Sequence, residues 1–499
     1  MDISNLSIAT IRSLGIDTIN KANSGHPGMV LGSAPALYTL FNKELNIYNK
    51  EENWINRDRF VLASGHASAL LYSLLHLDGF DVTIDDLKNF RQLHSRTPGH
   101  PEIEMTHGVD ASSGPLGQGI PMATGMAMAE KFLSSQYNKE NFDIIDHYTY
   151  VLCGDGDMQE GVTYEAASLA GHLSLGKLIV LYDANKVTLD GPLSMSFSEN
   201  VKKRYEACNW QVIEVKDGND IQEIHKAIKK GKKEQYKPTL IIVNTVIGFG
   251  SANQGTNKVH GAPLGKEDGK NAKLSYGFDH EEFYVPEEVY EDFKKPIKRG
   301  KSKFNKWNKL FKEYKNQYPQ VAKQLEDAIA GKYSLNIDEL LKNYPVGHND
   351  ATRNTSLEVI QEVAKQNPTF LSGTADLASS TKTKIKDEDD FSVENYNGRN
   401  LVFGIREFAM VAIMNGMTLH KGVKVSAGGF LVFSDYFKAA VRMACLMKLP
   451  IILPLSHDSI AVGEDGPTHQ PIEQFAMLRS IPNMHVIRPG DAVEMAAAW

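Results

Sequence analysis

The sequence predicts an α/β protein with two domains, each a parallel β-sheet covered by helices. Two observations predict this class. In the first half of the chain, apolar runs that read as buried strands alternate with helix-like stretches, as in DHYTYVLCGDGD, then EGVTYEAASLAGHLSLG, then KLIVLYDAN. Strands that are apolar throughout and alternate with helices are typical of a parallel sheet covered on both faces. The same alternation resumes after Thr352, so a second domain of the same class is expected there.

The predicted elements follow in order along the chain. After KLIVLYDAN, the runs WQVIEVKDG and PTLIIVNTVIGFG predict two more strands. Between about Gly265 and Tyr344, aromatic residues recur among many charges at the spacing of amphipathic helices, which predicts a charged helical connector. Beyond it, SLEVIQEVAKQNP predicts a helix, TFLSGTADL a strand, KVSAGGFLVFSDYFKAAVRMACLMKLP a strand, loop and helix, and IILPLSHDS a strand. We therefore place one domain at 1–320, including the connector, and the other at 321–499.

Composition limits the function classes. The 499 residues include 54 Lys plus Arg and 61 Asp plus Glu, a formal net charge of −7, which argues against a nucleic-acid partner. The apolar runs are shorter than the roughly 20 residues of a membrane span, and the N-terminus lacks the pattern of a secretory signal, so we expect no membrane partner. Three isolated cysteines, Cys153, Cys208 and Cys445, argue for a reducing compartment. We expect a cytoplasmic enzyme.

Histidines beside glycine or proline are frequent. Of the 16 histidines, those with such a neighbour are His26, His66, His100, His107, His172, His260 and His348. Glycine and proline place a residue on a loop, where backbone and side chain can approach a ligand closely. A single histidine of this kind usually belongs to a surface turn. The strings SGHPG, SGHAS, TPGHPE, VHGAP and GPTHQP together instead indicate loops that converge on a ligand in the folded chain.

The motif GDGDMQEG, followed by YDANKV, indicates a metal site. Asp155 and Gly156 lie on a glycine turn after a predicted strand, and Asn185 follows the next strand. One helix and one strand separate them, so both side chains are expected at the same carboxyl edge of a parallel sheet, where ligands bind. A carboxylate, an amide oxygen and the backbone carbonyl of Val187, together with diphosphate oxygens, suit Mg²⁺, or Ca²⁺ with longer bonds.

The motifs taken in order resemble the transketolase family over essentially the whole chain. Those that match are NSGHPG, LASGHASALLY, TPGHPE, GPLGQG, GDGDMQEG, KVHGAPLG, GIREFAM, FLVFSDY, HDSIAVGEDGPTHQP and RPGD. The resemblance implies two thiamine-diphosphate-binding domains, the first for the diphosphate and the second for the aminopyrimidine. It implies a homodimer with active sites at the subunit interface. The implied reaction moves a two-carbon ketol unit from a ketose phosphate (xylulose 5-phosphate) to an aldose phosphate (ribose 5-phosphate or erythrose 4-phosphate) in the pentose phosphate pathway.

The resemblance also implies cofactor contacts, residue by residue. The metal ligands of the family match Asp155, Asn185 and the carbonyl of Val187. Its contacts to the diphosphate and the thiazolium ring match His66, Gly114, Leu116, Gly156 and His260. Glu407, in GIREFAM, matches the glutamate that bonds the pyrimidine nitrogen and thereby drives removal of the thiazolium C2 proton. We expect Glu407 to be buried with a raised pKa, since desolvation disfavours the charged carboxylate, and to meet Glu160 near the subunit boundary.

Three aromatic residues of the second domain recur at three-residue spacing in FLVFSDY, namely Phe430, Phe433 and Tyr436. The spacing alone indicates one stripe of a helix core. The resemblance implies instead that these residues form the pocket around the pyrimidine ring, where aromatic side chains supply stacking and a low dielectric.

The substrate contacts are likewise implied by the resemblance. Cleavage of the donor sugar between C2 and C3 requires removal of the C3 hydroxyl proton, and a histidine suits this task near neutral pH. His26 and His260 match the proton-transfer pair, whereas His100 and His469 match contacts to donor hydroxyls. Two aspartates match further hydroxyl contacts, Asp376 and Asp465. The residues that match the phosphate contacts at the channel mouth are Arg353, Ser380 and His457.

Two features depart from the family pattern. Phe408 stands where the family usually has His, a variant that bacterial members share. The chain stops inside a helix pattern, IRPGDAVEMAAAW, so we expect the end of the second domain and a third domain to be missing. TPGHPE, GPLGQG and VHGAPLG favour transketolase over deoxyxylulose-phosphate synthase. A dihydroxyacetone synthase-like enzyme and a cofactor-binding but catalytically silent fragment both stay open.

Overall fold

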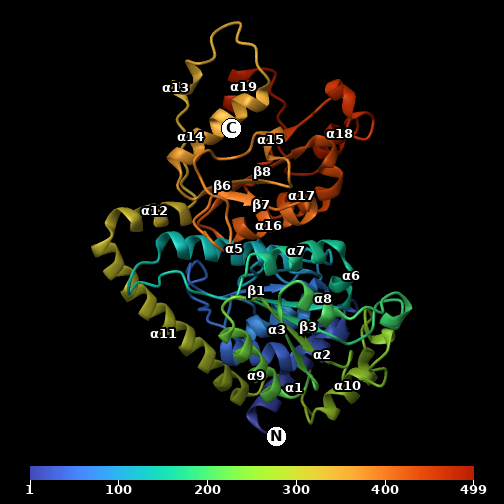
Figure 1. Ribbon diagram of the computed structural model, residues 1–499. Helices are drawn as coiled ribbons and strands as arrows, with labels where there is room; N and C mark the ends of the chain where they lie inside the picture. Colours follow the sequence, from blue (N-terminus) through green and yellow to red (C-terminus); the bar gives the residue numbers. More distant parts are fainter. The chain divides into compact units, whose positions relative to one another are not determined.

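The computed structural model describes all 499 residues, which divide into two compact units (Figure 1). The first unit comprises Met1–Ala123 and His147–Lys309, and the second comprises Thr124–Asp146 and Leu310–Trp499. Two long helices, α5 (Gly119–Tyr137) and α11 (Glu287–Gln317), begin in the first unit and end in the second. Each unit contains one all-parallel sheet and its own helices, which confirms the predicted two-domain α/β class.

The first unit has a five-stranded sheet in the order β1-β2-β3-β5-β4. Its strands are β1 (Arg59–Leu62), β2 (Thr149–Gly154), β3 (Leu178–Asp183), β4 (Gln211–Val215) and β5 (Thr239–Val243). All but the edge strand β4 are buried along their whole length, as continuous apolar runs predict. The four strands expected from the sequence are β2 to β5. The short run RFVL of β1 gave no periodic signal.

Nine helices lie wholly within the first unit. They are α1 (Ile3–Ala22), α2 (Pro27–Thr39), α3 (Ser68–Leu77), α4 (Ile84–Lys88), α6 (Asp155–Gln159), α7 (Gly161–His172), α8 (Val201–Ala207), α9 (Ile221–Lys233) and α10 (Gly265–Ser275). Asp2 caps α1 by accepting from the backbone N–H of Asn5. Pro27 begins α2, a helix that is buried on every side and contacts β3. The core of the unit is thus formed by α1 to α3 and the central strands.

The region predicted as a charged helical connector contains α11 followed by α12 (Pro319–Ile329), whereas α10, at its start, belongs to the first unit. The N-terminal half of α11 is fastened to the first unit through Asp292, which is buried and accepts from Tyr38 Oη at 2.8 Å and Ser7 Oγ at 3.0 Å. About two turns further along, the guanidinium of Arg299 donates to backbone carbonyls, including that of Asn42 at 2.7 Å. Buried polar contacts thus hold a helix whose solvent face is rich in lysine.

The second unit has a four-stranded parallel sheet in the order β7-β6-β8-β9. Its strands are β6 (Phe370–Thr374), β7 (Asn400–Val402), β8 (Lys424–Phe430) and β9 (Leu455–Ser456). Its remaining helices are α13 (Asp338–Leu341), α14 (Thr352–Gln366), α15 (Ala378–Thr381), α16 (Glu407–His420), α17 (Ser434–Leu446), α18 (Gln474–Arg479) and α19 (Ala492–Ala498). The three strands predicted for this half are β6, β8 and β9. The last of these contains only two residues of IILPLSHDS.

Close helix packing and a docked C-terminal helix order the second unit. Gly125 of α5 lies so close to α16 that a Cβ atom there would be 2.0 Å from the carbonyl oxygen of Ile413. The predicted helix after Gly490 is α19, and Trp499 at its end donates from Nε1 to Ser356 Oγ of α14 at 2.9 Å. No helix of either unit has both the length and the apolar character that crossing a membrane requires.

Candidate cofactor and substrate site

The carboxyl edge of the first sheet brings the predicted metal ligands together. Gly154 at the end of β2 pairs with Asp183 at the end of β3, so the residues that follow these strands emerge side by side. Asp155 begins α6 and accepts from the backbone N–H of Lys186 at 2.7 Å. Lys186 has a φ of 64°, a left-handed conformation that costs a residue with a Cβ about 1 kcal/mol, and it turns the chain toward Asp155. The spacing of GDGD and YDANKV therefore predicted the juxtaposition correctly.

A second buried carboxylate, which the motifs did not indicate, lies at the same edge. Asp183 is buried and accepts from Asn185 Nδ2 at 2.7 Å and from the hydroxyl of Thr245. Burial raises the pKa of the Asp155 carboxyl, and burial with the nearby Asp155 charge raises the pKa of Asp183 to about 7. Two carboxylates close together at a sheet edge concentrate negative charge there, and a divalent cation neutralises such charge.

The donor set fits a hard cation that also binds phosphate oxygens. The chain holds no group of three or more His, Cys, Asp or Glu side chains with the geometry of a metal site. A cation at this edge would therefore take one carboxylate oxygen from Asp155, the amide oxygen of Asn185 and the carbonyl of Val187. Mg²⁺ and Ca²⁺ prefer such oxygen sets, and Mg²⁺ commonly completes its coordination with substrate or cofactor phosphates.

Asp157, the second aspartate of GDGD, ties three loops of the site together. It is buried and accepts from Ser64 Oγ at 2.6 Å, from the N–H of Gly117 at 2.8 Å and from the N–H of Gly154 at 3.0 Å. These donors belong to the loops that carry SGHAS, GPLGQG and GDGD. Burial raises the pKa of the Asp157 carboxyl. The sequence offered a signal for this residue, a carboxylate two positions after Asp155 in a glycine turn, but its partners are distant in the chain.

Four of the predicted histidines form one cluster. The ring centroid of His26 lies 5.2 Å from that of His66, 6.4 Å from that of His100 and 5.9 Å from that of His260, and the rings of His66 and His260 stack at 5.4 Å. His26 precedes Pro27 at the start of α2, and His66 lies in a short 3₁₀ turn after β1. His100 and His260 lie on loops. The convergence that glycine and proline neighbours suggested is confirmed for these four residues.

Burial keeps the clustered histidines neutral. Desolvation, together with the charge of Arg91, lowers the pKa of His26 to about 4. Desolvation, together with the neighbouring histidines, lowers the pKa of His66 to about 3. Desolvation also lowers the pKa of His100 and of His260. Neutral imidazoles act as hydrogen-bond donors and as proton acceptors at physiological pH.

The polar groups of this cluster fit a bound anion. The Nδ1 atom of His260 is buried without a hydrogen-bond partner, and a bound group that satisfies it would remove this cost. Arg91 lies beside the cluster, donating to Ser24 Oγ at 2.9 Å and to His26 Nδ1 at 3.4 Å. Arg91 was not indicated by any sequence motif. Its contact with Gly99 of TPGHPE, where a Cβ would lie 3.1 Å from Arg91 Nε, is evident only in the folded chain.

Glycines let the predicted thiazolium and diphosphate residues approach one another. A Cβ at Gly156 would lie 2.7 Å from Leu116 Cδ1, and one at Gly114, whose φ is 147°, would lie 3.3 Å from the ring of His100. The glycines therefore let Leu116 and His100 pack directly against the backbone at this edge. Glu160 follows α6 at the surface. Local desolvation of its carboxyl, together with the Asp157 charge, raises its pKa.

The three predicted aromatic residues of the second unit lie together. The rings of Phe430 and Phe433 are nearly parallel, with centroids 5.7 Å apart, and Tyr436 meets Phe433 edge-on at 6.0 Å. Phe430 ends β8, whereas Tyr436 belongs to α17 and is 66% exposed. A single helix-core stripe is thus excluded, because the chain changes from strand to helix between these residues.

Glu407 is the first residue of α16 and is half-buried rather than enclosed. The sequence predicted that Glu407 is buried. It is less buried than expected because it begins α16 near the surface, where the neighbouring Ile405 is 76% exposed. Within the second unit alone, the carboxyl of Glu407 therefore remains accessible to a bound group.

The predicted substrate residues of the second unit are only partly gathered. His457 stacks on Phe430 with centroids 3.7 Å apart, and His469 meets Phe433 edge-on at 5.4 Å. Partial burial, with the charge of Arg353, lowers the pKa of His457. Arg353 and His457 line a cavity of about 880 Å³ in this unit. Residues expected to contact substrate that do not line this cavity are Asp376, Ser380, Asp465 and His469.

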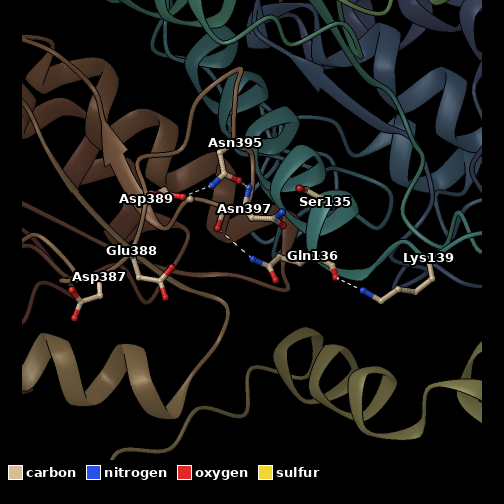
Figure 2. A pocket seen from close by; sticks show the side chains of 9 residues that line it. Ser135, Gln136, Lys139, Asp387, Glu388, Asp389, Asn395 and Asn397 are labelled. Carbon is tan, nitrogen blue, oxygen red and sulfur yellow. Dashed lines mark hydrogen bonds between the residues drawn. The ribbon is translucent and has the colours of Figure 1, made fainter.

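A smaller cavity of about 440 Å³ contains none of the predicted site residues (Figure 2). Its lining is polar and includes Asp387, Glu388 and Asp389. Figure 2 shows Asn395 directed toward Asp389, to which it donates at 2.6 Å. Glu388 is paired with Arg399 at 2.7 Å. The polar groups of this cavity thus largely satisfy one another.

Comparisons with known proteins agree with this geometry. Residues 3–334 match the model of the transketolase thiamine diphosphate binding domain, and residues 349–499 match that of the transketolase pyrimidine binding domain. The chain is 57% identical over 496 residues to transketolase from Bacillus subtilis, covering 99% of this chain and 74% of that protein. It is 56% identical to transketolase from Geobacillus stearothermophilus, covering 100% and 75%.

Solved structures show the same likeness. The chain superposes with a TM-score of 0.97 and 45% identity on transketolase from Pichia stipitis in complex with sedoheptulose 7-phosphate, covering 100% of this chain and 75% of that one. The corresponding values for transketolase from Leishmania mexicana are 0.97 and 42%, with the same coverage. These relatives are all transketolases, which does not favour the dihydroxyacetone synthase-like or catalytically silent alternatives. The chain spans about three quarters of their length and belongs to the transketolase family of thiamine-diphosphate-dependent transferases.

Proposed function

We propose that the clustered histidines and the Asp155–Asn185 edge carry out the family reaction, transfer of a two-carbon ketol unit between sugar phosphates. The donor is a ketose phosphate such as xylulose 5-phosphate, and the acceptor is an aldose phosphate such as ribose 5-phosphate or erythrose 4-phosphate, as in the pentose phosphate pathway. Two observations carry this proposal: four histidines of lowered pKa converge, and Asp155 binds the loop that contains Asn185 and Val187 at the sheet edge. When bound, thiamine diphosphate supplies the ring carbon that adds to the ketose carbonyl and accepts the electron pair of the broken bond.

The first unit would hold the metal and the diphosphate. Asp155, Asn185 and the Val187 carbonyl supply oxygen ligands to Mg²⁺ or Ca²⁺. His66 and His260 donate hydrogen bonds to diphosphate oxygens, for which the unpartnered Nδ1 of His260 provides support. Gly114, Leu116 and Gly156 would line the diphosphate and the thiazolium ring, and the two glycines support this role by letting Leu116 and His100 pack close to the backbone.

The histidines would move protons during cleavage and ligation. A base for the C3 hydroxyl of the donor must be neutral near pH 7, and the lowered pKa values of His26 and His260 satisfy this requirement. The same residues return the proton to the acceptor. His100 and His469 would contact donor hydroxyls and orient the sugar.

The second unit would hold the pyrimidine ring and the rest of the sugar phosphate. Glu407 would share a proton with a ring nitrogen of the pyrimidine. Phe430, Phe433 and Tyr436 would stack on the ring, in keeping with their grouping and the exposure of Tyr436. Contacts to sugar hydroxyls are assigned to Asp376 and Asp465, and contacts to the phosphate to Arg353, Ser380 and His457.

We propose that the enzyme is a cytoplasmic homodimer whose active sites combine the first unit of one copy with the second unit of the other. Support comes from the accessibility of Glu160, Glu407 and Tyr436 within one chain, because groups that bind an apolar ring need to be covered. The three free cysteines suit a reducing compartment. Glu160 of one copy would then approach Glu407 of the other.

A coupled assay tests the reaction. With thiamine diphosphate and Mg²⁺, the protein is incubated with xylulose 5-phosphate and ribose 5-phosphate, and the glyceraldehyde 3-phosphate formed is measured. Turnover that depends on both sugars and on the cofactor supports the proposal. Turnover with formaldehyde but not with ribose 5-phosphate would identify a dihydroxyacetone synthase instead. Cofactor binding without turnover of either acceptor would identify a silent protein.

Mixing two inactive variants tests the shared site. Asp155→Ala damages the first unit and Glu407→Ala the second, so each homodimer is inactive. If sites are shared between copies, a mixed dimer has one intact site, and a random mixture regains about a quarter of wild-type activity. If each copy builds its own site, mixed dimers regain no activity.

A further inference from the structure

The amide group of Asn185 has a fixed orientation. Its nitrogen Nδ2 donates to Asp183 Oδ2 at 2.7 Å, and its oxygen Oδ1 accepts from the backbone N–H of Val187 at 3.0 Å. A carboxylate only accepts and a backbone N–H only donates, so a single amide orientation satisfies both neighbours. In that orientation the oxygen, not the nitrogen, lies on the side of Val187.

Asp183 is itself held rigidly. It is the last residue of β3, pairs with Gly154 of β2 and Val243 of β5, and is 1% exposed. The hydroxyl of Thr245, which follows β5, donates to the oxygen of Asp183 that Asn185 does not use. Both carboxylate oxygens therefore have donors, and the side chain has no freedom to turn away from Asn185.

We propose that Asp183 is a positioning residue that fixes the Asn185 amide with its oxygen available to the divalent cation. This proposal rests on the metal role assigned to Asn185 above. The two ends of an amide have nearly the same shape, so rotation by half a turn exchanges an oxygen for an NH₂ group at little steric cost. Beside a cation, that exchange replaces an attractive dipole by a repulsive one. Asp183 prevents it, because the rotated amide would place its oxygen against a carboxylate.

The sequence pattern agrees with this role. Asp183 ends β3 and Asn185 follows it by two residues, and the hydrogen bond between them shows that their side chains lie on the same side of the backbone. Burial of the Asp183 carboxylate costs free energy, and the benefit that accompanies this cost is a ligand atom of Asn185 held in place. Partners that orient metal ligands in this way commonly change metal affinity by about 10- to 100-fold when they are removed.

The test measures metal binding and not turnover. Mn²⁺ is titrated at pH 8 into protein saturated with thiamine diphosphate, and free Mn²⁺ is counted by electron paramagnetic resonance. We expect Asp183→Ala to weaken Mn²⁺ binding by about 10-fold or more. Asp190→Ala, which removes an exposed carboxylate from the same loop, is the matched control and should bind as the wild type does.

Two double variants separate orientation from general damage. In Asp183→Ala with Asn185→Asp, the carboxylate has two equivalent oxygens and no wrong orientation, so Mn²⁺ binding should recover relative to Asp183→Ala alone. In the exchange variant, Asp183→Asn with Asn185→Asp, the hydrogen bond between the two side chains is kept with its direction reversed, and oxygens remain to accept from Thr245 and Val187, so binding should stay close to that of the wild type. The exchange variant conserves volume and answers the question if Asp183→Ala fails to fold.

The outcomes distinguish this proposal from the proposed function. Equal Mn²⁺ affinity of the wild type and a folded Asp183→Ala overturns the positioning role and leaves the metal site intact. Loss of binding in a folded exchange variant also overturns it. Absence of cofactor-dependent Mn²⁺ binding in the wild type overturns the metal role of Asn185, and the positioning role with it.

Discussion

The imidazole rings of His66 and His260 stack with their centroids 5.4 Å apart, although one residue follows the first strand of the sheet and the other lies beyond β5. Neither ring gains a charged partner from this contact. Burial and the neighbouring histidines lower the pKa of His66 to about 3, against an ordinary value of 6.5. Folding thus lowers the proton affinity of the clustered histidines.

The lowered proton affinity of His66 predicts a pH dependence of stability. Between pH 6.5 and pH 3, the unfolded chain binds a proton at His66 that the folded chain does not, so the contribution of this residue to stability is complete above 6.5 and falls as the pH falls. Between pH 7.5 and pH 4.5, we expect the free energy of unfolding of His66→Asn to fall by about 3 kcal/mol less than that of the wild type. Urea unfolding at a series of pH values measures this difference. His94→Asn, at an exposed position, should parallel the wild type, and identical slopes for all three proteins would contradict the prediction.

Arg91 is expected to keep His26 in its neutral form. Desolvation is the main cause of the low pKa of His26, and the guanidinium charge 3.4 Å from Nδ1 is the next. Arg91→Ala should therefore raise the pKa of His26 toward 6.5 and move the acid limb of kcat/KM to higher pH. Imidazole resonances followed by NMR through a pH titration measure the pKa directly. Arg96→Ala, whose ion pair with Asp81 lies on the surface, is the control, and an unchanged titration of His26 in Arg91→Ala would refute the effect.

Much of the site was predictable because, in a parallel sheet, the spacing of residues along the sequence determines which of them emerge at the same edge. A strand, helix and strand return the chain to the same edge, so GDGD and the asparagine of YDANKV specified where Asp155 and Asn185 meet. The partners that fix them follow no such rule. Thr245 and Arg91 come from separate loops, and their contacts depend on loop geometry that no periodic pattern encodes.

The fold was predictable to a similar extent. Long apolar strands gave a clear signal, whereas β1, with four residues, and β7, with three, are too short to show a period. Spacing alone was misleading for Phe430, Phe433 and Tyr436. A strand, a 3₁₀ turn and a helix succeed one another within that segment, so one period does not describe it.

Close packing of α5 on α16 predicts a strong effect at Gly125. A Cβ there would lie 2.0 Å from the carbonyl oxygen of Ile413 and 2.8 Å from the backbone nitrogen of Met417, and backbone atoms cannot move aside independently. We expect Gly125→Ala to destabilise the protein by about 3 kcal/mol or to prevent folding. The midpoint of thermal unfolding measures this. Gly161→Ala is the matched control, because nothing lies within 4 Å of a Cβ at that helical position, and it should unfold at or slightly above the wild-type midpoint. Equal midpoints for both variants would show that the helices adjust.

Arg353 is expected to bind the phosphate of the substrate. Its exposed guanidinium borders the cavity that His457 also lines, where a charge-assisted hydrogen bond to phosphate is available. Arg353→Ala should raise KM for xylulose 5-phosphate by about 10-fold and leave KM for hydroxypyruvate, which has no phosphate, nearly unchanged. Initial rates with each donor measure the two constants. Arg442→Ala, exposed on α17, is the control, and an equal rise for both donors would reject a phosphate contact.

Glu407 is expected to control proton removal from the cofactor without supporting the fold. It lies half-buried in the first turn of α16, so its truncation leaves the helix core intact. Glu407→Ala should slow exchange of the cofactor C2 proton for deuterium by about 100- to 10,000-fold, because the pyrimidine nitrogen loses the carboxyl with which it shares a proton. Rapid quenching and NMR of the released cofactor measure the exchange. Glu407→Gln should be similarly slow, since an amide keeps the shape but cannot exchange a proton as a carboxyl does, whereas Glu313→Ala, on the exposed face of the connector, should exchange at the wild-type rate. Wild-type exchange in a folded Glu407→Ala that still binds the cofactor would assign proton removal to another group.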